Sequence, residues 1–125
     1  MLGGGIEGEH RPHLKPIIPS DLVGAGTPVD WRSKMNPVKN QGSCGSCWSF
    51  AATATIEGRY AIKHGSKVTL AEQQMVDCAT ACSACFGGWA SSALQYVQKA
   101  GGQMSAASYP YSGVKGGCRF SSGSV

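Results

Sequence analysis

The chain has 125 residues, which is enough for one domain with its own core but too few for two ordinary domains. Its net charge is +4, and its basic residues are scattered instead of grouped with aromatic residues, which argues against nucleic-acid binding. No apolar run approaches the roughly 20 residues of a transmembrane helix, so we expect no membrane span.

The cysteine content favours an oxidising compartment. An even number of cysteines, six in so short a chain, is typical of a disulfide framework. The first residues lack the hydrophobic core of a signal peptide. We therefore expect either that a signal has been removed or that the chain is a fragment. Two pairs of Cys-x-x-Cys form, Cys44/Cys47 and Cys82/Cys85, leave a zinc site as an alternative at this point.

Residues 1–27 are rich in Gly and Pro and have no hydrophobic periodicity, so we interpret them as a flexible tail, a possible propeptide remnant. His10 and His13 lie in this tail, and we expect them to be solvated. The ordered part is predicted to begin at Pro28, and Trp31 is expected in the core because of its large apolar area.

The strongest helix prediction runs from Ser46 or Cys47 to His64, a segment without proline and rich in alanine. Its apolar residues cover most of the circumference, which predicts burial on most sides. Gly58 is expected to mark a close approach by another backbone. Glu57 is expected inside, where its carboxylate needs a partner.

Two shorter helices are predicted downstream. Thr69 fits a capping box before a helix from Ala71 to about Cys78. A compact cysteine-rich loop follows, and a third helix is expected over 89–100, ended by Gly101. The sequence therefore predicts a mainly α-helical domain with cysteine-bearing loops between its helices.

Cys47 is the candidate nucleophile. A cysteine attacks as its thiolate, and the N-terminus of a helix stabilises an anion through its dipole and its N–H groups. The side-chain amide of Gln41 could turn toward the same point and complete an oxyanion hole with the Cys47 N–H. The residues between them are small and let a substrate backbone approach: Gly42, Ser43, Gly45 and Ser46.

The segment from Pro37 to Phe50 resembles the active-site segment of papain-family cysteine proteases, near the cathepsin L branch. Further matches fall in the same order over about residues 28–120: Asp30-Trp31-Arg32, Glu72-Gln73, Val76-Asp77-Cys78, Cys85-Phe86-Gly87-Gly88, Ser92-Ala93-Leu94, Tyr109-Pro110-Tyr111 and Cys118. The resemblance implies the left-hand domain of an α+β family, with a long central helix, over residues 28–118. Residues 119–125 would begin the crossover to a β-rich right-hand domain, which is absent from this chain.

The resemblance also implies roles for individual residues. Cys47 would be the nucleophile and Gln41 the oxyanion-hole amide. Two disulfides would join Cys44 to Cys85 and Cys78 to Cys118, which leaves Cys82 over. The positions that would bind substrate are Gly45, Ser46, Trp48, Gly87, Gly88 and Trp89, where the Gly-Gly backbone pairs with an extended peptide and Trp89 flanks the second-residue pocket.

The family's catalytic histidine and asparagine lie more than roughly 100 residues beyond the cysteine. His10, His13 and His64 match neither position. We therefore expect a cysteine endopeptidase that works through a thioester at Cys47, here as a fragment that is inactive alone. The alternatives are a non-catalytic truncated module and one chain of a two-chain protease. The zinc alternative is weak, because its Cys-x-x-Cys pairs are more widely separated than the usual about 15–20 residues.

The resemblance implies partners and a location. The partners would be an extended peptide or protein substrate, a right-hand domain that supplies the histidine and asparagine, and a propeptide or cystatin-like inhibitor. No cofactor and no metal are expected. The location would be lysosomal, vacuolar or extracellular.

Overall fold

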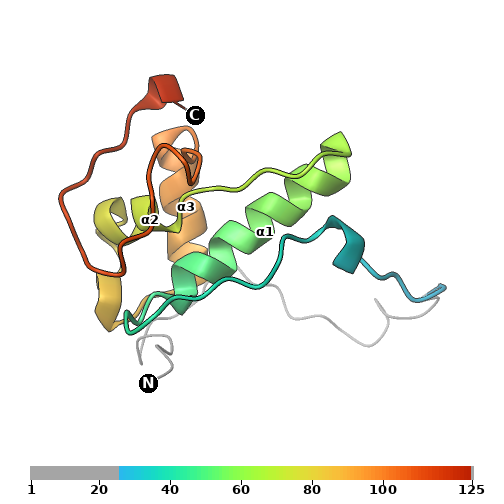
Figure 1. Cartoon of the computed structure of the whole chain (residues 1–125), viewed down its shortest axis with the longest axis horizontal. Helices are drawn as coiled ribbons and strands as arrows, with labels where there is room; N and C mark the ends of the chain where they lie inside the picture. The colour runs from blue at the N-terminus through green and yellow to red at the C-terminus, as the bar shows by residue number, and fades with distance from the viewer. Residues whose placement is uncertain (1–25, 125) are drawn as a thin grey trace.

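The computed structural model describes residues 26–124, and among these residues it contains three α-helices and no extended strand. The helices are α1 (Cys47–His64), α2 (Glu72–Cys78) and α3 (Ala90–Ala100), with short 3₁₀ turns at Arg32–Lys34, Ala84–Phe86 and Ser122–Ser124. Both α2 and α3 pack against α1, beside its N-terminal part (Figure 1). The predicted mainly α fold with a long central helix is confirmed.

Helix α1 begins and ends where the sequence predicts. It ends at Gly65, which adopts a left-handed conformation (φ 75°) and donates its N–H to the Ala61 carbonyl at 3.0 Å. The prediction of burial on most sides is wrong. The buried residues form one face, while Ala51, Thr55 and Arg59 are exposed. Alanine has too little apolar area to force a second face inward.

The main core lies where α1, α2, α3 and the loop before α3 meet. Its buried members are Trp48, Ala52, Met75, Val76, Ala79, Ala84 and Ala93. Trp48 is the largest of them, and its indole N–H donates to the Ala84 carbonyl at 2.9 Å, so its one polar atom is satisfied. Burying a side chain of this kind stabilises the fold by about 1.5–3 kcal/mol or more.

Helix α2 is buried along its whole length. The predicted capping box at Thr69 is wrong: the helix begins at Glu72, with Ala71 at the N-cap and no side-chain cap. Residues 69–71 are instead extended and paired with 104–106, because Ala71 N–H donates to the Met104 carbonyl and Ala106 N–H to the Thr69 carbonyl. These two bonds hold the chain straight up to the helix start.

Two further expectations are wrong. Trp31 is 49% exposed, because no described element packs over it. Gly58 faces the Met35 side chain and not another backbone, since a Cβ added there would lie 2.8 Å from Met35 Sδ. The tail predicted over 1–27 falls almost wholly outside the described residues, and His10 and His13 with it.

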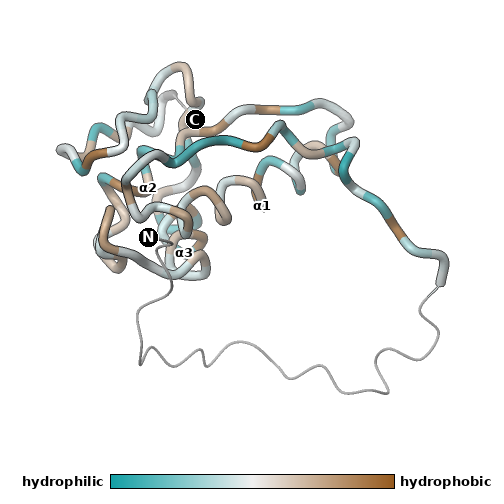
Figure 2. The backbone as a smooth tube through the Cα atoms, turned by 60° about the horizontal axis from the view of Figure 1, so that its bottom comes forward, coloured by the Kyte–Doolittle hydropathy of each residue, from teal (hydrophilic) through white to brown (hydrophobic). Residues whose placement is uncertain are grey.

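Along the described residues, 26–124, the apolar stretches are short (Figure 2). None of the helices within residues 26–124 has the length and apolar character that crossing a bilayer requires.

Candidate active site

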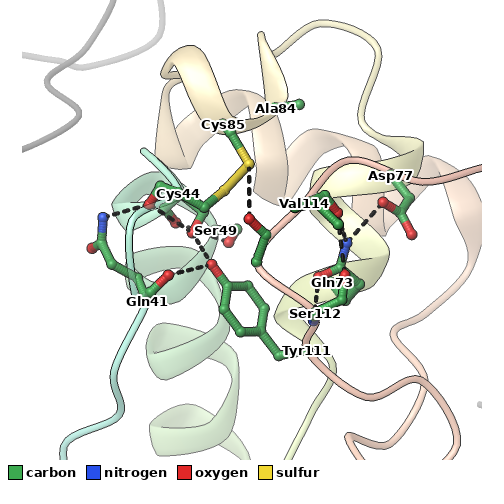
Figure 3. Close-up of a disulfide and its surroundings, with 12 residues drawn as sticks. Gln41, Cys44, Ser49, Gln73, Asp77, Ala84, Cys85, Tyr111, Ser112 and Val114 are labelled. Atoms are coloured by element: carbon green, nitrogen blue, oxygen red, sulfur yellow. Dashed lines mark hydrogen bonds between the residues drawn. A yellow bond between two sulfur atoms is a disulfide. The ribbon is translucent and has the colours of Figure 1, made fainter.

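The loop before α1 fixes Cys47 at a helix start. Cys47 is the first residue of α1, partly exposed, and takes part in neither disulfide. Three residues earlier, Cys44 is bonded to Cys85 with an S–S length of 2.06 Å, and Gly45 N–H donates to the Cys85 carbonyl at 2.9 Å (Figure 3). The loop is thus attached covalently and by a hydrogen bond to the segment before α3.

Gln41 is held beside this loop. Its Nε2 donates to the Cys44 carbonyl at 2.8 Å, and its own backbone carbonyl accepts a 2.7 Å hydrogen bond from the Tyr111 hydroxyl (Figure 3). An amide nitrogen carries two protons. The second proton of Nε2 can therefore be offered to the oxygen of a bound carbonyl without breaking the contact to Cys44.

Ser46 and Trp48, which the resemblance places beside the cleft, have buried side chains. Ser46 is fully buried, and Trp48 is 3% exposed in the core. The Ser46 hydroxyl lies 2.7 Å from the Tyr111 hydroxyl and makes no cap to α1. The predicted substrate contacts at these two positions stay predictions.

The predicted substrate edge lies in the interior of the domain. Gly87 and Gly88 are both buried, and Trp89 is partly buried as the N-cap of α3. A Cβ at Gly88 would lie 2.8 Å from the Cβ of Cys82 and 2.9 Å from Trp48 Cδ2, so only glycine fits there. The substrate roles of these three residues, and of Gly45, stay predictions.

The cysteines settle two points. Cys78 is bonded to Cys118, so both predicted pairings are present in the structure. The zinc alternative fails because Cys44 and Cys85, one from each Cys-x-x-Cys pair, are joined to each other. Within the described part of the chain, no group of three or more His, Cys, Asp or Glu side chains could hold a metal ion.

Sequence reasoning missed the role of Lys39. Its ammonium lies 2.7 Å from Glu57 Oε1 and also contacts the carboxylate of Glu72, and both carboxylates are buried. Burial lowers the pKa of Lys39, but the hydrogen bonds to the two glutamates outweigh it and hold the pKa above its usual value. This network joins the segment before the nucleophile loop to α1 and α2.

The partner expected for Glu57 is confirmed. Besides Lys39, its carboxylate accepts the Asn36 side-chain amide at 2.9 Å and the Leu70 N–H at 2.8 Å. These three donors cannot be separated from α1 without leaving the buried charge of Glu57 unpaired. The sequence indicated only that Glu57 needs a partner.

No described histidine is placed to serve Cys47. His64 ends the 18-residue helix that Cys47 begins, which separates them by about 25 Å at 1.5 Å per residue. It stacks on Tyr60 with ring centroids 4.3 Å apart, as suits an exposed residue of the last turn.

The described part of the chain thus combines three helices, two disulfides and a partly exposed thiol at the start of α1. Residues 25–125 match the papain family cysteine protease domain, and the chain belongs to this family.

Its relatives include proteins of the cathepsin L branch. The chain is 48% identical over 130 residues to digestive cysteine proteinase 2 of Homarus americanus, covering 100% of this chain and 40% of that protein. It is 47% identical over 115 residues to a cathepsin L-like proteinase of Phaedon cochleariae, covering 87% and 35%. The structure of procathepsin L 3 from the larval midgut of Tenebrio molitor matches with a TM-score of 0.73 and 42% identity, covering 77% of this chain and 32% of that one. The chain thus spans 40% or less of the length of these relatives.

Proposed function

We propose that this chain forms the nucleophile-bearing half of a cysteine endopeptidase active site. The observation that carries the proposal is the position of Cys47, at the first residue of α1 and three residues after a cysteine fixed by a disulfide. Gln41, held by the Cys44 carbonyl, would be the second donor of the oxyanion hole.

The reaction would be acyl transfer. The Cys47 thiolate attacks the peptide carbonyl, and the resulting oxyanion accepts hydrogen bonds from the Cys47 N–H and the Gln41 amide. The intermediate collapses to a thioester and expels the amine, which takes a proton from a general acid. Water then hydrolyses the thioester and releases Cys47.

The general acid and base would come from a second polypeptide segment that carries a histidine and an asparagine, the right-hand domain of the family. The distance of the described histidine supports a base from another segment, since His64 lies about 25 Å from Cys47 along α1. An extended peptide substrate, a propeptide or a cystatin-like inhibitor would then occupy the cleft between the two parts.

The two disulfides support a lysosomal, vacuolar or extracellular location, because disulfides persist in oxidising compartments. A non-catalytic module is the second candidate for the chain on its own. His64, the histidine among the described residues, lies about 25 Å from Cys47, and this separation favours the non-catalytic module.

The experiment is alkylation by a peptidyl epoxide, followed by mass spectrometry of the labelled cysteine. We expect Cys47 to be labelled rapidly when a polypeptide with the right-hand domain is added, and slowly without it. Cys47→Ser should abolish this labelling, and Cys82→Ser should leave it unchanged.

Two results would contradict the proposal. Equal labelling of Cys47 and Cys82 in the assembled protein would show that Cys47 has no special role. Rapid labelling of Cys47 in the isolated chain would show that no second segment is needed.

A further inference from the structure

One hydroxyl group connects both ends of the nucleophile loop. Tyr111 Oη lies 2.7 Å from the Gln41 carbonyl oxygen and 2.7 Å from Ser46 Oγ. Gln41 precedes the loop, and Ser46 is the residue directly before Cys47. Figure 3 shows the Tyr111 ring reaching toward Gln41 and Cys44 from a segment far along the chain.

The directions of these hydrogen bonds follow from the donors available. A carbonyl only accepts, so the single Tyr111 proton points to Gln41, and Ser46 must donate to the Tyr111 oxygen. Gln41 is then held at two places, because its backbone carbonyl is bonded to Tyr111 and its side-chain Nε2 to the Cys44 carbonyl at 2.8 Å. The first bond holds the backbone of Gln41, and the second holds its side-chain amide.

Tyr111 is itself held firmly. Its ring meets the Phe50 ring edge-on, with centroids 5.0 Å apart and an interplanar angle of 81°. The residues after it are bonded to Gln73 of α2, which is 1% exposed: Ser112 N–H donates to Gln73 Oε1 at 2.9 Å, and Gln73 Nε2 donates to the Val114 carbonyl at 2.7 Å. The hydroxyl is therefore supported by a buried helix.

We propose that Tyr111 is a positioning residue that aims the Gln41 amide at the oxyanion of the reaction, an inference that rests on the proposed function. Tyr111 touches no reacting atom and acts through Gln41. A donor that is aimed in advance stabilises the developing charge without reorganising during the reaction. Loss of the hydroxyl would leave the Gln41 backbone and Ser46 without their shared partner and let the amide turn away.

The first test observes the Gln41 side-chain amide by NMR in the whole chain. In Tyr111→Phe, which keeps the ring, we expect its two proton signals to move toward those of a solvent-exposed glutamine. Tyr96→Phe is the matched control, since that hydroxyl contacts Gln74 on α2 and not the nucleophile loop. Unchanged Gln41 signals in Tyr111→Phe, or an equal change in Tyr96→Phe, would overturn the inference.

Ser46→Ala covers the case in which Tyr111→Phe fails to fold. It removes the other partner of the same hydroxyl and keeps Tyr111, so a smaller change of the same Gln41 signals is expected. If the Gln41 signals did not change in Ser46→Ala, the inference would be overturned in that case.

The second test separates the inference from the proposed function. A peptide aldehyde adds reversibly to Cys47: the S–C bond forms, the C=O double bond becomes single, and the thiol proton passes to the oxygen, which then lies in the oxyanion hole. With a polypeptide that carries the right-hand domain present, we expect Tyr111→Phe to weaken this capture about 3- to 10-fold. In a Gln41→Ala background it should cause no further loss, and alkylation of Cys47 by iodoacetamide, which forms no oxyanion, should be unchanged in Tyr111→Phe.

The outcomes are distinct. No capture by the unmodified chain in the presence of the right-hand domain, with Gln41 signals that respond to Tyr111→Phe, would count against the proposed function and leave the positioning role in place. The positioning role would be overturned if Tyr111→Phe did not weaken the capture, or if it weakened the capture by the same factor in the Gln41→Ala background.

Discussion

Tyr109 Oη donates a 2.7 Å hydrogen bond to Asp77 Oδ2 in the interior of the domain, and it accepts the Arg119 N–H at 3.0 Å. Tyr109 is 1% exposed. Burial first, and then its bond to Asp77, raise the pKa of Tyr109 above its usual value. The bond therefore ties the segment after α3 to α2 and also makes the fold sensitive to alkaline pH.

The stability of the fold should fall as the pH rises through the raised pKa of Tyr109. A group whose pKa is higher in the folded state stabilises it fully below the unfolded value, about 10 for tyrosine, and loses this contribution above the folded value. Urea unfolding at increasing pH, with the thiols blocked, measures the decline. Tyr109→Phe should show a shallower decline, and a slope equal to that of the unmodified chain would contradict the assignment.

Lys39→Ala should destabilise the protein by about 2–4 kcal/mol, because it leaves the buried carboxylates of Glu57 and Glu72 without their cation. The lower end of this range of destabilisation allows for the partial exposure of Lys39 to solvent. Urea unfolding near neutral pH provides the measurement. Lys63→Ala, on the exposed last turn of α1, is the control and should change the stability by less than about 0.5 kcal/mol. Equal effects of the two substitutions would mean that the network contributes nothing.

Gly88→Ala should destabilise the fold by about 1–3 kcal/mol, since the added methyl group overlaps Trp48 and Cys82. Thermal unfolding and Trp fluorescence report the stability and the environment of Trp48. Gly117→Ala is the matched control, because nothing lies within 4 Å of its Cβ. A Gly88→Ala variant as stable as Gly117→Ala would show that the contact is not tight.

Replacing both Cys78 and Cys118 by Ala should cost about 4 kcal/mol, from a closed loop with a sequence separation of 40 residues. The disulfide holds the segment after Tyr111 against α2. In the variant without the disulfide, this segment should become accessible to proteases. Limited proteolysis with mass spectrometry locates the cleavage. Cys82→Ser keeps both disulfides and should leave the segment protected. Cleavage in the same place in both variants would contradict the role of the bond.

The sequence predicted well what depends on neighbouring residues. The bounds of α1 follow from Gly65, which stops a helix by adopting a left-handed conformation, and from the absence of proline before it. Helix α2 was predicted to begin within one residue of its observed start, but its cap was assigned wrongly because the cause is not local. Thr69 is a good capping residue, but the bonds from 69–71 to 104–106 keep the chain extended there.

The candidate site shows the same division. Cys47 and Gln41 could be found from one short motif, whereas the role of Tyr111 could not. Its hydroxyl bonds a carbonyl with a sequence separation of 70 residues, and no periodicity records such a contact. The burial of Trp31 was predicted wrongly for a related reason. A large apolar side chain indicates that a residue tends to be covered, but it does not indicate which segment covers it.

The polar burial of α2 has a consequence for the order of assembly during synthesis. A helix as short as Glu72–Cys78 is not stable alone in water, so it needs its partners to persist. Those partners include the Ser112 N–H, the Val114 carbonyl and the Gly116 N–H, all of which leave the ribosome long after Cys47. The thiol is therefore made early but held in position late, because a nascent chain that stalls before Tyr111 lacks both these partners of α2 and the hydroxyl that bonds Gln41 and Ser46.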